Sequence, residues 1–190
     1  MKDVRQTSIT LGALLVFWLI IGAYFYVFKK ESGGKDAEME SFASAIQSTQ
    51  SVSRNAPAGW RVHENARYGF SLFYPEGMAV KEFDEGGGAS TITFEDTKNG
   101  LGFQIFVVPY AEPQVSEKRF RKDNPSGVRE NLENVVVDGA TGAAFVGKHP
   151  FLGETREVWF IRKGYLYEVT TFKGLGDWFV PIMQTWRFIE

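Results

Sequence analysis

Residues 101–109 read LGFQIFVVP, and this stretch decides the fold. Phe103, Ile105 and Val107 are two residues apart, so a β-strand places them on one face, with Phe106 and Val108 on the other. Apolar side chains on both faces are typical of a strand that is covered on both sides. We therefore expect other elements to pack above and below a sheet at this strand.

Further segments with the same two-residue period extend the predicted sheet. Short alternating runs between turn residues favour antiparallel pairing, and about six or seven such strands are expected. The dipeptides Asn99-Gly100, Asp138-Gly139 and Lys163-Gly164 suit hairpin turns because glycine accepts a positive φ. The runs are YGFSLFYP (68–75), MAVKEF (78–83), ASTITFED (89–96), VVV (135–137), AAFV (143–146), EVWFIRKG (157–164) and YLYEVTTF (165–172).

Two segments interrupt the strand pattern with a helical one. VSEKRFRKD (115–123) has Ser116 as an N-cap, and DWFVPIMQTW (177–186) has Asp177 in the same role. The second segment carries Trp178, Ile182, Met183 and Trp186 near one helical face, which must be buried on the sheet. Together these elements predict an α+β domain, an antiparallel sheet with helices packed on it, over residues 60–190.

A transmembrane helix is predicted near the N-terminus, after a short polar tail at 1–8. Ile9 to Phe28 is a run of twenty residues without a charge, and a helix of that length spans about 30 Å, the hydrocarbon thickness of a bilayer. The run is too long for a signal peptide, and its aromatic and lysine flank suits a membrane interface. We therefore expect a retained anchor that inserts into the lipid bilayer. Its marker residues are Ile9, Trp18, Tyr24, Tyr26, Phe28, Lys29 and Lys30.

The predicted location is the cell membrane, as a single-pass protein with the domain on the extracytoplasmic side. This orientation follows the common plan of a short tail, one anchor and a large outer domain. The distribution of charges does not favour it, because Lys2 and Arg5 precede the anchor while Lys29, Lys30 and Lys35 follow it.

Residues 29–59 are rich in serine and are predicted to form a spacer between the anchor and the domain. Within it, Asp36 to Gln50 is compatible with a short amphipathic helix, since apolar residues recur at i, i+3, i+4 and i+7. Its apolar stripe could dock on the domain, lie on the membrane or pair with another copy, but with only three large apolar residues a marginal helix is favoured over a specific interaction. The stripe consists of Met39, Phe42, Ala43 and Ile46.

Composition and motifs give no sign of catalysis, and we expect no enzyme, cofactor or metal. The net charge of −2 removes any whole-chain argument for nucleic-acid binding, and zero cysteines exclude disulfides, thiolate metal sites and a cysteine nucleophile.

His63, expected to end the first strand, and His149 lack metal-type spacing and are interpreted as surface residues. Gly86-Gly87-Gly88 is interpreted as a loop tip. Four acidic residues approach one another if their strands pair: Asp84, Glu85, Glu95 and Asp96. They are interpreted either as weak Ca²⁺ ligands or as solvated acids in turns.

The densest basic cluster lies in the first predicted helix, with Arg129 nearby. It is either a solvated helix face, interrupted by Glu117 and Asp123, or a contact for an acidic partner or anionic headgroups. As a partner contact it comprises Lys118, Arg119, Arg121 and Lys122.

YGFSLFYP at 68–75 resembles the Y-x-F-x-(F/Y)-x-Y-P opening of PsbP-like domains. The order of the later segments also resembles that family. They are GLGFQIFVVP, a polar helix, VVVDGATGAAFVG, EVWFIRKGYLYEVTTF and an apolar helix closing on Trp186-Arg187-Phe188. The resemblance covers roughly residues 60–190 and implies an α/β/α sandwich around an antiparallel sheet. It also implies a non-catalytic module that binds other proteins. The chain departs from the family in two respects: it has the predicted anchor, and it has Met78 where relatives often have Trp. No photosynthetic role is therefore carried over.

Three functions are compatible with these observations. The first is a membrane-anchored, non-catalytic PsbP-like module that binds another membrane-associated protein. The second is a small-molecule or lipid-binding domain in which the many aromatic residues line an apolar pocket, although period-two placement favours ordinary core packing. The third is a hydrolase with an unfamiliar site, which requires His63 or His149 to converge with carboxylates.

Overall fold

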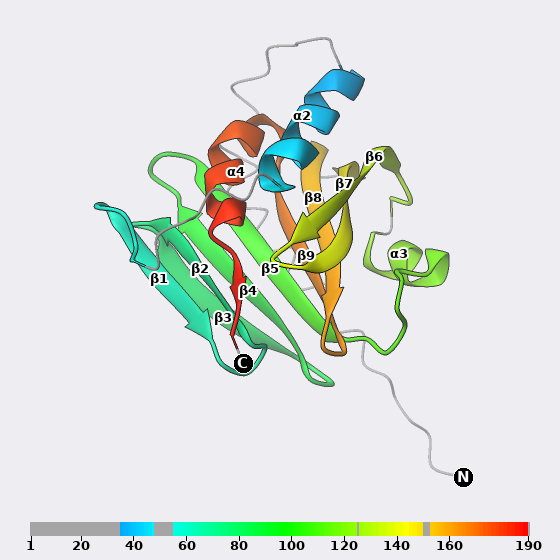
Figure 1. Ribbon diagram of the computed structural model, residues 1–190, viewed down its shortest axis with the longest axis horizontal. Coiled ribbons are helices and arrows are strands. Elements are labelled where there is room, and N and C mark those ends of the chain that lie inside the picture. The colour runs from blue at the N-terminus through cyan, green and yellow to red at the C-terminus, as the bar shows by residue number, and fades with distance from the viewer. Residues whose placement is uncertain (1–34, 48–54, 125, 150–152, 190) are drawn as a thin grey trace.

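The computed structural model describes residues 35–47, 55–124, 126–149 and 153–189, and these form an α+β fold with two antiparallel sheets (Figure 1). The larger sheet has seven strands in the order β3-β4-β5-β9-β8-β7-β6. In that order the strands are Ala79–Gly86, Ala89–Asp96, Leu101–Pro109, Tyr165–Phe172, Gly153–Arg162, Ala140–His149 and Arg129–Val137. The predicted antiparallel sheet is thus confirmed.

Strand β5 is buried on both faces, as its sequence predicts. Phe103, Ile105 and Val107 are fully buried on the inner face, which faces the main core, and Phe106 is buried on the opposite, outer face. Strands β4 and β9 pair with β5 along its two edges. This segment therefore occupies the interior of the sheet, where apolar residues on both faces are stabilised by burial.

Two of the predicted hairpin turns adopt the left-handed conformation at both central residues. Asp138 and Gly139 have φ values of 44° and 80°, and Lys163 and Gly164 have values of 48° and 81°. Such turns match the right-handed twist of the strands they join, here β6 to β7 and β8 to β9. Glycine at the second position adopts this conformation without a steric penalty.

The segment Phe70–Pro75 does not belong to the large sheet. It is β2, the middle strand of a three-stranded sheet with β1 (Trp60–Asn65) and β10 (Arg187–Phe188). The turn between β1 and β2 needs Gly69, because its φ is +67° and an added Cβ would lie 3.2 Å from the Ile189 carbonyl oxygen. The predicted run of strands is therefore divided between two sheets that share one core.

Helix α4 (Gly176–Gln184) buries its apolar face in that core, as predicted. Phe179, Ile182 and Met183 are buried along it, and Trp186 follows it and stacks on Phe70 with ring centroids 4.5 Å apart. The prediction that Asp177 is the N-cap is wrong. A 3-10 turn (Lys173–Leu175) leads into the helix, so Leu175 is the N-cap and Asp177 lies in the first turn, where a carboxylate is favourable.

Helix α2 (Lys35–Gln47) docks on the inner face of the domain beside α4 (Figure 1). The helix itself is predicted from the sequence, but the expectation of a marginal helix without a specific interaction is wrong, because its stripe is buried in the main core of the domain. The Gln47 side chain donates to the Asn134 carbonyl at 2.9 Å, and Gln184 donates to the Ala45 carbonyl at 2.8 Å. The core therefore includes residues that precede Trp60. The buried stripe is the predicted one: Met39, Phe42, Ala43 and Ile46.

Helix α3 (Glu117–Asp123) lies on the outer face, and its N-cap is the predicted Ser116, which accepts from the Arg119 amide at 3.3 Å. A small apolar cluster lies beneath this helix: Tyr110, Phe120, Phe145, Trp159 and Leu166. Helices thus lie on both faces of the large sheet, but the elements on the inner face contribute a much larger core.

The predicted anchor, Ile9 to Phe28, lies outside the described residues, as do the tail 1–8 and residues 29–34. Among the helices that the structure describes, none has the length and hydropathy needed to cross a bilayer.

Candidate functional site

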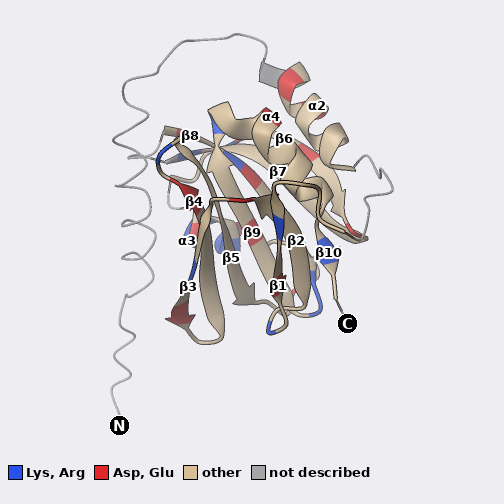
Figure 2. Cartoon of the chain, turned by 90° about the vertical axis from the view of Figure 1, so that its left-hand side faces the viewer, with Lys and Arg blue, Asp and Glu red and all other residues tan. Residues whose placement is uncertain are grey.

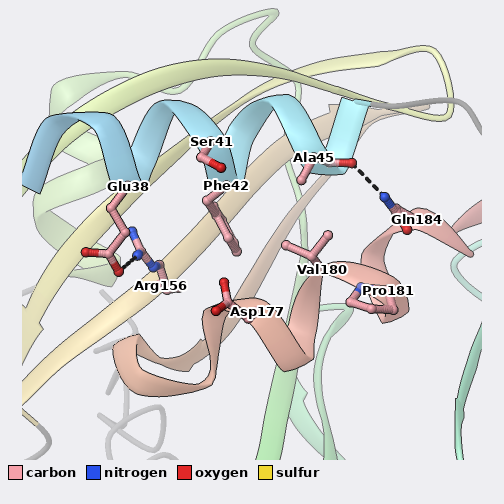
Figure 3. A pocket seen from close by; sticks show the side chains of 9 residues that line it. All are labelled: Glu38, Ser41, Phe42, Ala45, Arg156, Asp177, Val180, Pro181 and Gln184. Carbon is pink, nitrogen blue, oxygen red and sulfur yellow. Dashed lines mark hydrogen bonds and ion pairs between the residues drawn. The ribbon is translucent and has the colours of Figure 1, made fainter. Parts of the chain in front are cut away.

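A groove of about 390 Å³ lies between α2 and α4 (Figure 3). Helix α2 contributes one wall, α4 the other, and β8 supplies Arg156 beneath them. The lining combines apolar, acidic, basic and uncharged polar side chains, so the groove has no single chemical character. Its lining residues are Glu38, Ser41, Phe42, Ala45, Arg156, Asp177, Val180, Pro181 and Gln184.

Arg156 is a buried cation whose contacts hold α2 in place. It is 2 % exposed, forms an ion pair with Glu38, and lies over the ring of Phe42 with its guanidinium carbon 5.0 Å from the centroid. Its Nη1 also donates to the Met39 sulfur at 2.7 Å, while its Nε, which has no hydrogen-bond partner among the described residues, lies against Gly176. Because these contacts hold the guanidinium within the protein, we interpret the groove as part of the packing interface that fixes α2 on the domain.

The outer face of the large sheet has a different chemistry. One row of directly paired residues crosses all seven strands: Phe83, Thr91, Phe106, Glu168, Trp159, Ala143 and Asn134. The adjacent row is more polar and runs Lys81, Thr93, Gln104, Thr170, Glu157 and Phe145. We call the central part of these two rows the outer-face site: Thr93, Phe106, Gln104, Glu157, Trp159, Glu168 and Thr170.

Glu157 is a buried carboxyl group with three donors around it. Thr155 donates to its Oε1 at 2.6 Å, while Thr170 and the Trp159 indole donate to its Oε2 at 2.7 and 3.2 Å. Burial raises the pKa of Glu157 to about 7, although the three hydrogen bonds act in the opposite direction. Desolvation of the carboxylate therefore outweighs its hydrogen bonds.

Glu168 lies beside Glu157 on the neighbouring strand and faces the end of α3. Its pKa is raised well above the usual range, first by burial and second by the nearby carboxylate of Asp123, with Arg119 opposing both effects. Arg119 itself forms an ion pair with Asp123. The outer-face site and the adjoining Arg119 and Asp123 of α3 thus bring together three carboxyl groups and one guanidinium, all poorly accessible to water.

Comparison with known proteins adds one observation to this geometry. No protein-family model and no curated protein matches the chain. Among solved structures, the chain is similar to the solution structure of cyanobacterial PsbP (CyanoP) from Synechocystis sp. PCC 6803, with a TM-score of 0.51 and 13 % sequence identity. The similarity covers 73 % of this chain and 98 % of that one. The fold is PsbP-like.

Two of the four residues of the predicted basic cluster are neutralised by ion pairs within this PsbP-like domain. Arg119 pairs with Asp123, and Arg121 pairs with Glu117 at 2.9 Å. Figure 2 shows that basic and acidic positions are interspersed over the described residues. Of the four cluster residues, Lys118 and Lys122 are the exposed ones for which no ion pair is found among the described residues, so a partner contact here would rest on those two.

The other predicted candidates do not come together. Asp84 pairs with Ser90 in the β3–β4 ladder while Glu95 pairs with Ala79, so the two acidic pairs lie at opposite ends of the hairpin. Gly86 to Gly88 form its turn, all with positive φ, as expected for a loop tip. Among the residues that the structure describes, no group of three His, Asp or Glu side chains could hold a metal ion.

His63 is half-buried, not a fully exposed surface residue, and it does not end its strand, which continues to Asn65. Its ring lies against Phe70 and Phe94, with centroids 5.8 and 5.2 Å apart, and burial lowers its pKa while Glu82 opposes that shift. The aromatic residues that suggested a ligand pocket pack in the same way, for example Phe94 on Phe103 at 4.3 Å. In these contacts the aromatic side chains therefore form part of the packed core.

Sequence reasoning did not identify the outer-face site. A signal was present, because Glu157 and Glu168 share strand parity with Trp159 and Leu166, respectively. An acidic residue on the same strand face as large apolar residues is expected to lie on a face that other elements cover. The strand pairing is visible only in the structure: it places Glu157 in one row with Thr170 and Gln104, and Glu168 in the adjacent row with Phe106.

Proposed function

We propose that this chain is a single-pass membrane protein whose PsbP-like domain binds a protein partner of the same membrane on the extracytoplasmic side. Ile9 to Phe28 is the proposed anchor, and Lys118 and Lys122 are proposed partner contacts on α3. The PsbP-like fold supports a non-catalytic, protein-interacting module. The proposal assigns no chemistry to the domain beyond binding.

The docking of α2 is the observation that carries this proposal. Because α2 packs on the domain from Lys35 onward, only residues 29–34 separate the domain from the proposed anchor. Six residues reach about 20 Å when fully extended. A domain held this close to the bilayer meets membrane proteins at a high effective concentration, so even a modest intrinsic affinity suffices for binding.

Orientation is testable because the chain contains no cysteine. A Lys118→Cys variant of the full chain carries a single thiol on an exposed helix position. We expect a membrane-impermeant maleimide to label it in intact cells. Labelling that occurs only after lysis would contradict an extracytoplasmic domain.

Partner binding is testable by site-specific photo-cross-linking in native membranes. A photoreactive residue at Lys122 of the full chain is expected to give a discrete cross-linked product with one membrane-associated protein. The same residue at Glu64, which is exposed on β1, is the matched control and is expected to give much less. Absence of any product at Lys122, or equal diffuse products at both positions, would contradict the proposed contact.

A further inference from the structure

Helix α3 is held on the large sheet by an apolar contact and by a charged one. Phe120 is buried and packs against Phe145 and Trp159, with ring centroids 5.8 and 5.7 Å apart. Arg119 and Asp123, the ion pair of α3, have side chains that are only 12 and 9 % exposed. A helix of seven residues is too short to be stable in water by itself, so these two contacts decide whether α3 is docked.

The charged contact contains a proton. The side chains of Asp123 and Glu168 are hydrogen-bonded to each other across the interface between α3 and β9. Two carboxyl groups form such a bond only if one of them is protonated, because an ionised carboxylate has acceptors and no donor. The ion pair with Arg119 favours the ionised form of Asp123. Glu168 is therefore the protonated group, and it donates the hydrogen bond to Asp123.

The surroundings of Glu168 stabilise its neutral form. The charged groups that act on it are Asp123 and Arg119 from α3 and Glu157 from β8, while β5 has no charged residue. Glu168 is only 6 % exposed, so water does not compensate an ionised carboxylate there. Loss of the proton removes the hydrogen bond to Asp123 and places two carboxylates side by side with one guanidinium. Both effects act across the interface that holds α3 on the sheet, and both are relieved when α3 moves away and water enters.

We infer that α3 is a pH-sensitive latch, which is docked on the sheet while Glu168 is protonated and detaches when that proton is lost to solvent at higher pH. This inference goes beyond the proposed function, because the latch belongs to the domain itself and acts without a partner. It also bears on that function, since Lys118 and Lys122 lie on α3 and move with it. The proposed partner contact is then weakened as the pH rises.

The direction of the effect follows from proton linkage. Burial and the carboxylate of Asp123 raise the pKa of Glu168 well above its ordinary value of 4.5, and detachment of α3 returns it toward that value. Between the two values the docked state holds one more proton than the detached state. The ratio of detached to docked α3 therefore rises with pH, by up to about tenfold per pH unit, and becomes constant above the raised pKa.

The latch can be tested by electron paramagnetic resonance on the full chain in detergent micelles. Because the chain has no cysteine, a nitroxide on Lys118→Cys is the sole label, and its line shape separates a docked, slow α3 from a detached, mobile one. We expect the mobile fraction to grow from pH 6 to 9, by up to about tenfold per pH unit. A nitroxide on Glu64→Cys, an exposed position of β1 in the other sheet, is the matched control and should not respond.

Four variants identify the group that titrates. Glu168→Gln imitates the protonated acid, since its amide can donate to Asp123, and should keep α3 docked at every pH. Asp123→Asn removes the competing carboxylate and leaves Arg119 to pair with an ionised Glu168, so it should also abolish the response; it covers the case in which Glu168→Gln fails to fold. Glu157→Gln should retain the response. Glu76→Gln, an exposed acid distant from α3, should behave like the parent chain.

A label on Lys118→Cys that stays equally immobile from pH 6 to 9 would overturn the inference. A parental pH response in both Glu168→Gln and Asp123→Asn would do the same. Mobilisation of the Glu64→Cys label together with the label on α3 would indicate global unfolding and would also refute a latch. None of these measurements needs a partner, so a failed latch and a failed cross-linking experiment are distinguishable.

Discussion

Replacing Glu157 by glutamine removes a buried acid while preserving its shape. In the parent chain its two oxygens accept from Thr155, Thr170 and Trp159. In the variant the amide oxygen can keep the bonds from Thr170 and Trp159, while the amide N–H group donates to the Thr155 hydroxyl. We therefore expect the variant to fold, and to differ from the parent mainly in how its stability depends on pH.

The magnitude follows from the change in pKa on folding. Burial raises the pKa of Glu157 from its usual 4.5 to about 7, so between these values the unfolded chain loses a proton that the folded chain keeps. Unfolding then releases a proton, and the free energy of unfolding falls as the pH rises. At 1.36 kcal/mol per pKa unit, the full loss is about 3 kcal/mol, complete just above pH 7.

The assay is urea unfolding of both full chains in detergent micelles at several pH values from 4.5 to 8, followed by tryptophan fluorescence. We expect the stability difference, variant minus parent, to rise by about 3 kcal/mol across this range and then to remain constant. Glu168 is present in both chains, so its own titration cancels from the difference to a first approximation. A difference that does not change with pH would refute the claim that Glu157 is desolvated in the folded protein.

Three further substitutions test the packing, again by urea unfolding of the full chain. Phe42→Ala should lower the free energy of unfolding by about 3 kcal/mol, because the Phe42 ring packs against Phe179 and Arg156. The neighbouring Ser41→Ala should change it by less than about 0.5 kcal/mol. Equal effects of the two substitutions would contradict the docking of α2. Gly142→Ala should cost about 2 kcal/mol or more, since the new Cβ would lie 2.2 Å from the Trp159 carbonyl oxygen, and a neutral result would contradict that close approach. Thr185→Val should cost about 1–3 kcal/mol by leaving the Phe73 amide without the acceptor it now has at 2.8 Å, and an unchanged midpoint would show that this bond contributes nothing.

The elements that the sequence predicts well are those fixed by neighbouring residues. The period of LGFQIFVVP identifies a strand covered on both faces, and Asp138-Gly139 and Lys163-Gly164 identify the hairpin turns, because each signal depends on a few adjacent positions. The Ser116 cap and the stripe of α2 are local in the same sense.

Features that depend on distant pairing were missed. The strands divide into two sheets because β2 pairs with β1 and with the two-residue β10, and not with the next strand β3. Likewise, the shared strand parity of Glu157 and Trp159 indicates a covered face, but it does not identify the elements that cover it. The burial of Glu157 follows from the placement of β8 next to β9 and from the cover that α3 and its apolar cluster provide, neither of which a local pattern encodes.

The docking of α2 also has a consequence for biosynthesis. Its partners arrive late, since Gln47 bonds to Asn134 and Ala45 is contacted by Gln184, 87 and 139 residues further along the chain. During synthesis the helix therefore leaves the ribosome long before its binding surface exists, and contacts of such high sequence separation slow folding. Until α4 has emerged, the apolar stripe of α2 lacks part of its binding surface and remains available for contacts with other molecules.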